Sequence, residues 1–281
     1  MTAFTITTLP LENLIGAGRT ADVYAWGKDE VLKLYQSWMP SSVVEREYTS
    51  TLAASQAGIS VPEAHQLVQY QDRFGIIFER VRGVSLMREL ELHPWRVRSI
   101  ARQLAELHVQ INHCQVTANL PSHREQIRAG ILRSAALDPR KREHILQLLA
   151  ALPEGNALCH GDFHPDNVLL TSNGPVIIDW FTGAHGMPAA DLMRTLMILG
   201  TSALPPSVPA LQRSLIGLLR SILVSTYRTH YLHLNPIPPA ARNVWQLPLM
   251  AERLNEVEHY PQEKAFLMKQ IDSLLLVPRQ T

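Results

Sequence analysis

The sequence feature that most restricts the fold is a dense cluster of polar residues, 160–167 (HGDFHPDN), which leads directly into two short apolar runs. The runs cover 168–170 and 176–178, and Asn173-Gly174 lies between them. An Asn-Gly pair between apolar runs is the strongest short-range signal for a β-hairpin. A hairpin brings its two ends together. The sequence therefore predicts that polar groups before the first strand and after the second strand lie close to one another.

Three side chains at the ends of this hairpin are of the types that phosphoryl transfer requires. The reaction needs a carboxylate to orient the attacking hydroxyl, and oxygen ligands that hold Mg²⁺ on the phosphates. Asp162 and Asn167 lie in the loop before the hairpin, and Asp179 follows its second strand. We expect the hairpin to bring these three side chains to one point. The alternative is a polar loop in which Asp, Asn and Pro only form turns.

The pattern H-G-D-x-H-x-x-N-x-L, followed by the triplet I-D-W at 178–180, resembles the catalytic signature of the aminoglycoside phosphotransferase and choline kinase superfamily. This superfamily is related to protein kinases. The resemblance implies that Asp162 is the catalytic base and that Asn167 and Asp179 are the metal ligands. It also implies that Asp191 is a structural partner of the catalytic loop.

The N-terminal part contains a weaker signal of the same kind. Residues 15–23 (IGAGRTADV) resemble the glycine-rich loop of kinases, with Ala21 in place of the third glycine. The resemblance implies that Gly16, Gly18 and Val23 contact the nucleotide. An ordinary hairpin containing two glycines would have the same sequence pattern.

A lysine and a glutamate of the N-terminal part are expected to form an ion pair. Lys33 lies in an apolar run and resembles the strand lysine that binds the α- and β-phosphates of the nucleotide. Ser42 and Glu45 have the spacing of a capping box, which predicts a helix from Ser42 to near Gly58. On that helix Glu47 shares the inner, apolar face, where an unpaired carboxylate would be unfavourable. Lys33 and Glu47 would relieve each other, although a helix charge of purely structural importance is the alternative.

The hydrophobic period changes near Gly83. Before it, short β-branched runs predict a small antiparallel sheet with one main helix. After it, apolar residues recur with the period of an α-helix. The expected strands cover 11–15, 23–26, 31–35, 68–70 and 74–78, and the expected later helices cover 97–111, 145–152, 188–199, 207–227, 239–257 and 262–276.

The fold class is therefore α+β, and the resemblance implies a two-lobed protein-kinase-like fold. Residues 1–82 would form the N-terminal nucleotide-binding lobe, and residues 83–281 the larger, mainly helical lobe that binds the substrate and carries the catalytic residues. Between the lobes, the resemblance implies that the carbonyl of Glu79 and the amide of Val81 face the adenine edge.

Charge and composition exclude other partners. Lys and Arg total 26 against 25 Asp and Glu, so a net charge of +1 offers no electrostatic field for nucleic acid or an anionic membrane. No long uncharged apolar run is present. With only two cysteines, a disulfide framework is not expected. We expect a cytoplasmic protein whose partners are a nucleotide and a small-molecule hydroxyl acceptor.

These observations favour a phosphotransferase that moves the γ-phosphate of ATP or GTP, with Mg²⁺, to a hydroxyl of a small molecule. A protein kinase is less favoured because His-Gly-Asp replaces His-Arg-Asp and no Ala-Pro-Glu follows Asp179. A nucleotide-binding regulator that has kept the fold without turnover is a third possibility. The sequence argues against such a regulator because it keeps all the expected nucleotide-binding and catalytic residues: Lys33, Glu47, Asp162, Asn167 and Asp179.

The acceptor itself is not named by the sequence, but its charge is restricted. No Asp or Glu occurs between Asp191 and Glu252, whereas five arginines do. A multiply cationic acceptor is therefore disfavoured. Glu252 and Glu256, one helical turn apart, could hold an amine or could form a solvated helix face.

Overall fold

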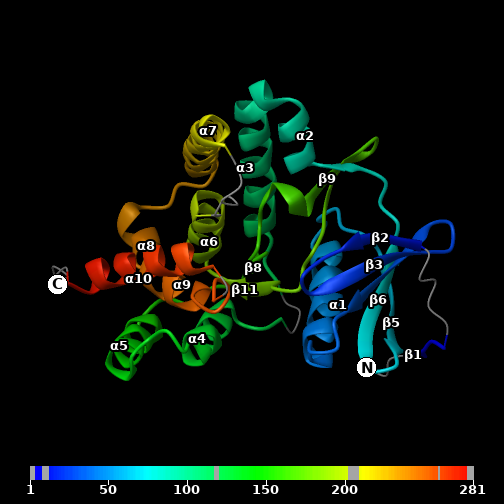
Figure 1. Cartoon of the computed structure of the whole chain (residues 1–281), viewed down its shortest axis with the longest axis horizontal. Coiled ribbons are helices and arrows are strands. Elements are labelled where there is room, and N and C mark those ends of the chain that lie inside the picture. Colours follow the sequence, from blue (N-terminus) through cyan, green and yellow to red (C-terminus); the bar gives the residue numbers. More distant parts are fainter. Residues whose placement is uncertain (1–3, 8–12, 117–119, 202–208, 259, 277–281) are drawn as a thin grey trace.

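A six-stranded sheet forms the N-terminal part of the computed structural model, which describes residues 4–7, 13–116, 120–201, 209–258 and 260–276. The strand order is β1-β5-β6-β4-β3-β2 (Figure 1). All pairs are antiparallel except that the two-residue edge strand β1 runs parallel to β5, so the predicted antiparallel sheet is in fact mixed. The strands are β1 (Phe4–Thr5), β2 (Leu14–Ala17), β3 (Ala21–Trp26), β4 (Glu30–Tyr35), β5 (Ala64–Tyr70) and β6 (Arg73–Glu79).

The alternation of side chains along β4 decides which residues face the single helix of this part, α1 (Ser41–Gln56). Successive side chains of a strand point to opposite faces. Leu32 and Leu34 belong to the apolar cluster on one face of the sheet. Tyr35 belongs to the cluster on the other face, together with Val44 of α1. Lys33 shares the face of Tyr35 and therefore points toward α1.

The start of α1 differs from the prediction, and its end agrees with it. The residue before the first helical position is Pro40, whose carbonyl accepts a hydrogen bond from the N–H of Val43 at 3.0 Å, and no side chain caps the helix. The predicted capping box of Ser42 and Glu45 is therefore wrong, because Ser42 already lies inside the first turn. Gly58 has a φ of +83°, the left-handed conformation expected just after a helix.

The remainder of the described chain is mainly helical. Helix α3 packs along α7, and both lie beside α6, whereas α4, α5, α9 and α10 build a second apolar core at the opposite end from the sheet (Figure 1). The helices are α2 (Leu86–Leu92), α3 (Val97–His113), α4 (His123–Arg133), α5 (Pro139–Ala150), α6 (Pro188–Thr201), α7 (Ala210–Leu234), α8 (Pro239–Asn243), α9 (Gln246–Arg253) and α10 (Pro261–Leu276).

Two small sheets lie between the large sheet and these helices. One has the order β10-β9-β7 and contains the predicted hairpin, in which Gly174 pairs with Thr171. The other pairs β8 with β11. The strands are β7 (Val84–Ser85), β8 (Ala157–Cys159), β9 (Val168–Thr171), β10 (Gly174–Ile177) and β11 (Ala184–Gly186).

One of the expected helices is divided into two in the structure. The prediction over 239–257 is wrong, because α8 ends at Asn243 and α9 starts at Gln246 around the buried Trp245. Pro248 explains the break: proline removes an N–H and is tolerated only in the first turn of a helix, which is where α9 places it. The other predicted helices and strands match observed elements, but α5 starts six residues before the expected 145 and α7 ends seven residues after the expected 227. Residues 11–12 and 207–208 of two predicted elements lie outside the described residues.

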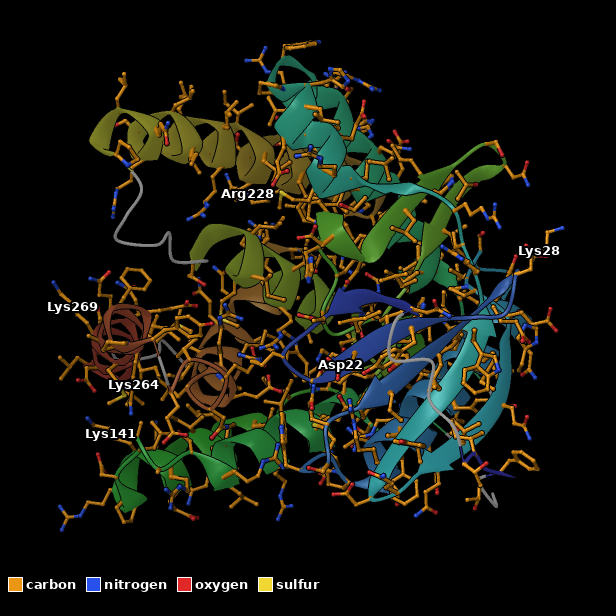
Figure 2. The ribbon with its side chains drawn as sticks, turned by 45° about the vertical axis from the view of Figure 1, so that its right-hand side comes forward. Asp22, Lys28, Lys141, Arg228, Lys264 and Lys269 are labelled. Atoms are coloured by element: carbon orange, nitrogen blue, oxygen red, sulfur yellow. The ribbon has the colours of Figure 1, made fainter. Side chains whose placement is uncertain are left out.

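Charged side chains are spread over this fold. Figure 2 shows Lys28 at the tip of the sheet, and Lys264 and Lys269 on α10 at the other end of the molecule. Within the described residues, no helix is both long enough and apolar enough to cross a membrane.

Candidate functional site

A cavity of about 560 Å³ lies between the large sheet and the β9–β10 hairpin. We call it the first cavity. Most of its walls are apolar, and its charged end is formed by Lys33, Glu47 and Asp179. The segment that joins the sheet to the helical part, 78–83, forms one side. Apolar side chains from the sheet and from the hairpin region cover the rest: Ile15, Val23, Val31, Phe78, Leu169 and Ile178.

Lys33 of β4 binds two carboxylates, that of Glu47 on α1 and that of Asp179, which follows the hairpin. Its Nζ donates to Glu47 Oε1 at 2.8 Å and to Glu47 Oε2 at 2.9 Å, so the predicted ion pair is present. The same Nζ donates to Asp179 Oδ1 at 2.8 Å. Glu47 is 2% exposed, which means that its charge depends on this partner.

Burial and charge act in opposite directions on the pKa values of this pair. Burial acts to lower the pKa of Lys33, but the carboxylates of Asp179 and Glu47 outweigh it, so the pKa of the lysine lies above its ordinary value. Burial raises the pKa of Glu47, and the lysine partly offsets that rise. Lys33 is therefore a fixed positive charge at the end of the first cavity.

Asp179 adopts a backbone conformation that few residues tolerate. Its φ is +66°, in the left-handed region where Asp and Asn are several-fold enriched among residues with a side chain. The preceding N–H, that of Ile178, donates to the carbonyl of Asn167 at 3.0 Å. The two ends of the hairpin are thus tied together, and Asp179 is turned toward Lys33.

Asp162 and Asn167, in the loop before the hairpin, are linked by a side-chain hydrogen bond. Asn167 Nδ2 donates to the backbone carbonyl of Asp162 at 2.8 Å and lies 3.3 Å from His164 Nε2. His164 Nε2 lies 3.7 Å from Asp162 Oδ2. Burial acts to raise the pKa of Asp162, but His164, Arg194 and His160 outweigh it and lower that pKa to about 2. Asp162 is therefore a carboxylate at neutral pH.

Asp191 of α6 holds the backbone of the loop that contains Asp162, which is the structural contact that the sequence resemblance implies. Its carboxylate is fully buried and accepts hydrogen bonds from the N–H groups of His160 and Gly161, each at 2.9 Å. His108 Nε2 and Asn112 Nδ2, both on α3, also lie 2.9 Å from it. Gly161 has a φ of +76°, which a residue with a side chain rarely adopts. The loop shape is therefore set by α3 and α6.

Arg194 of α6 is a residue that the sequence argument missed. Its side chain is 4% exposed, and its Nε donates to the carbonyl of Gly161 at 3.1 Å. Its guanidinium contacts Glu256 and lies 3.6 Å from Glu252 Oε2. These two glutamates raise the pKa of Arg194 against the effect of burial, and the charge of Arg194 acts on Asp162. Arg194 therefore holds the loop backbone at Gly161 and lowers the pKa of the neighbouring Asp162.

The same contacts correct both interpretations of Glu252 and Glu256. The two residues do not form one helix face, because α9 ends at Arg253 and Glu256 lies beyond it, and both are paired with Arg194 rather than free for an amine. Arg253 Nη1 donates in addition to Glu256 Oε2 at 3.0 Å. The chain spacing of about 60 residues between the arginine and its partners hid this network from the sequence argument.

Of the other residues predicted to contact the nucleotide, some line the first cavity and some do not. Val23, Glu79 and Val81 line the first cavity, whereas Gly16 and Gly18 do not. Gly16 pairs with Val23 in the sheet, and the N–H of Gly18 donates to the carbonyl of Ala21 at 2.8 Å.

Comparisons with known proteins agree with this geometry. A family model described as "Phosphotransferase enzyme family" matches residues 13–222. No curated protein sequence matches the chain.

Solved structures with the same fold cover nearly the whole chain. A thermostable mutant of aminoglycoside phosphotransferase APH(4)-Ia matches with a TM-score of 0.62 and 16% identity, covering 92% of this chain and 92% of that chain. The amicoumacin kinase hAmiN matches at 0.59 and 15%, covering 94% and 87%. A choline/ethanolamine kinase family protein from Mesorhizobium loti matches at 0.58 and 17%, covering 96% and 92%. At these identities the likeness shows the fold, and the predicted α+β, protein-kinase-like class is confirmed.

Proposed function

The chain belongs to the phosphotransferase enzyme family and is a small-molecule phosphotransferase, and from that premise we propose that it moves the γ-phosphate of ATP, with Mg²⁺, to a hydroxyl of its acceptor. The observation that carries this proposal is the convergence of Lys33 and Asp179 at the end of the first cavity with Asp162 and Asn167 beside them. The division into residues 1–82 and 83–281 stays a prediction.

The first cavity suits a nucleotide. Its apolar walls would enclose the adenine ring, and the positive charge of Lys33 would meet the α- and β-phosphates. The N–H of Val81 makes no hydrogen bond within the part of the chain that the structure describes, so it is available to the adenine edge. APH(4)-Ia and hAmiN have both been solved with the ATP analogue AMP-PNP, which favours ATP over GTP as donor here.

Asn167 and Asp179 would hold the metal ion. Asn167 uses its amide nitrogen for the loop, which leaves its amide oxygen for a ligand. One carboxylate and one amide oxygen suit Mg²⁺, which usually takes only one or two carboxylates and completes its shell with phosphate oxygens and water. When bound, Mg²⁺ supplies positive charge that neutralises the phosphates.

Asp162 would act on the acceptor. Its carboxylate accepts a hydrogen bond from the acceptor hydroxyl, orients that oxygen toward the γ-phosphorus, and receives the proton. The new bond forms between the acceptor oxygen and the γ-phosphorus as the bond from the γ-phosphorus to the β-phosphate oxygen breaks, releasing ADP. With its lowered pKa, Asp162 is a weak base whose main contribution is orientation.

A turnover assay tests the function directly. ADP release is measured with Mg²⁺ and ATP or GTP against a pool of small alcohols, against a protein mixture, and without acceptor. We expect release with small alcohols and a preference for ATP. Release only with protein would indicate a protein kinase. A thermal shift with nucleotide but no release under any condition would indicate a regulator without turnover.

Asp179→Asn is expected to weaken Mg²⁺-dependent nucleotide binding. Asparagine tolerates the left-handed backbone of this position, so the loss reports the missing charge. The decrease in metal affinity should at least equal the roughly 10- to 100-fold produced by changes in outer-shell partners. Nucleotide affinity is titrated at several Mg²⁺ concentrations. Asn167→Ala should change the metal dependence less, because the amide is neutral, and an unchanged dependence in Asp179→Asn would contradict its role.

Multiply cationic acceptors are expected to be poor substrates. Each ammonium group taken out of water needs an anionic or hydrogen-bonding partner, and Glu252 and Glu256 are already bound to arginine. Hygromycin B is bound in a structure of APH(4)-Ia, so aminoglycosides are the reasonable comparison. Steady-state kinetics with kanamycin-like polyamines at two ionic strengths check this. Efficient phosphorylation that weakens with added salt would show that the acceptor site is anionic after all.

A further inference from the structure

A second cavity, of about 610 Å³, lies on the acceptor side of the catalytic loop. It is formed by α2, by the loop residues 164–166, by the end of α6 and by α7. Figure 1 shows α2 and α7 on either side of α3 at the same end of the helical part. The volume suits a ligand of metabolite or drug size.

The second cavity is adjacent to the group that would activate the acceptor. His164 lines it, and His164 Nε2 lies 3.7 Å from Asp162 Oδ2. Asp179 lines the first cavity instead. The two cavities are thus lined by the two ends of the hairpin, which the hydrogen bond from the N–H of Ile178 to the carbonyl of Asn167 holds together, and transfer between two bound molecules needs such proximity.

The walls of the second cavity are mainly aliphatic. The lining residues come from α2, the loop 164–166, α6 and α7, which are distant from one another in the sequence. The cavity therefore forms only when these four segments pack together. Leu199 and Leu223 are buried, and Leu215 is 56% exposed. The lining side chains include Met87, Leu90, Ile198, Leu199, Leu215, Ile216, Leu219 and Leu223. Such walls favour an acceptor with an apolar body, and the two carboxylates that line the cavity, Glu91 and Asp166, are few partners for several ammonium groups.

Arg220 is the one arginine or lysine among the residues that line the second cavity, and within the described residues it has no anionic partner. Glu91 Oε2 accepts from Arg88 at 2.9 Å, and Asp166 Oδ1 accepts from Ser85 Oγ at 3.3 Å. For Arg220, no hydrogen bond or ion pair occurs within the described ranges, where every carboxylate is more than 4.0 Å away. The stretch 202–208, which precedes α7, contains no charged residue that could pair with it.

Building on the proposed phosphotransferase function, we propose that the second cavity binds the acceptor, and that the acceptor is a mainly apolar alcohol carrying one anionic group that pairs with Arg220. An arginine beside apolar surface is well suited to this role because its planar guanidinium binds a carboxylate through two parallel hydrogen bonds. The apolar walls hold the carbon skeleton, and the hydroxyl points toward Asp162.

The experiment uses three alcohols with the same chain: ω-hydroxyoctanoate, the corresponding diol and the corresponding amino alcohol. ADP release with saturating ATP and Mg²⁺ gives kcat and KM for each, in the unaltered protein and in Arg220→Gln. We expect the hydroxy acid to have the highest kcat/KM. Arg220→Gln should raise its KM by about 10- to 100-fold, the value of a charge-assisted hydrogen bond, and should leave the KM of the diol and of ATP unchanged.

Arg228→Gln is the matched control, because Arg228 lies exposed on the same helix, α7, and does not line the second cavity (Figure 2). It should leave all constants unchanged. Preference for the amino alcohol, or an equal effect of Arg220→Gln on the hydroxy acid and the diol, overturns the inference. Turnover of other alcohols but none of these three also overturns it while leaving the proposed function intact. ADP release at a rate that no alcohol raises above the rate without alcohol contradicts the proposed function, and the inference with it.

Discussion

Asp162→Ala is expected to lower kcat by about 10²- to 10⁴-fold while leaving nucleotide affinity nearly unchanged, because general-base assistance and orientation of the hydroxyl account for a factor of that size. Asp162 is separated from the phosphate-binding charges: Lys33 contacts Glu47 and Asp179 and not Asp162. Single-turnover kinetics give the rate, and equilibrium titration with a non-hydrolysable ATP analogue gives the affinity.

Asp72→Ala provides the control for this variant. Asp72 is an exposed aspartate in the turn between β5 and β6, so its removal changes the net charge equally without touching the catalytic loop. It should leave both constants unaltered. A parallel decrease in nucleotide affinity for Asp162→Ala would place Asp162 on the metal ion and would contradict its assignment to the acceptor.

Asp191→Ala is expected to lower the free energy of unfolding by about 3–5 kcal/mol, the range found when one partner of a buried charged network is removed. The change leaves the N–H groups of His160 and Gly161 and the side chains of His108 and Asn112 without their acceptor. All of these groups are buried, so water cannot replace the carboxylate without opening the core. Urea unfolding followed by circular dichroism measures the loss.

Asp29→Ala is the comparison for stability. Asp29 forms an exposed pair with Arg82 at 3.4 Å, and exposed pairs contribute little. Its unfolding midpoint should stay close to that of the unaltered protein. If Asp191→Ala unfolded at the same denaturant concentration as Asp29→Ala, the proposed anchor of the catalytic loop would be wrong.

Local sequence patterns predicted much of the site because the hairpin is a local structure. Asn173-Gly174 set the turn, and the turn fixed the separation of Asn167 and Asp179. The pairing of Lys33 with Glu47 could be predicted for a similar reason, since helix geometry alone puts Glu47 on the buried face of α1. The roles of these residues in binding and catalysis stay predictions.

Contacts between distant helices could not be predicted in this way. Arg194 follows Asp191 by one turn and appears in the sequence as one of several arginines in an acid-free stretch. Only the packing of α6 against α9 and the turn after it brings Glu252 and Glu256 to Arg194 and pairs them with it. The sequence pattern of a single helix cannot predict such a contact, because the contact depends on how two helices are placed relative to each other.

The ion pairs of Lys33 have a consequence for selective inhibition. In the structure its charge is neutralised by Glu47 and Asp179, so a competitor of ATP need not bring a phosphate mimic. The rest of the first cavity offers mostly aliphatic and aromatic walls and the unbonded N–H of Val81. A flat, uncharged heteroaromatic compound with one hydrogen-bond acceptor fits these requirements. Such compounds cross cell membranes far more readily than charged antagonists of the acceptor site, which makes the donor cavity the better target for a chemical probe.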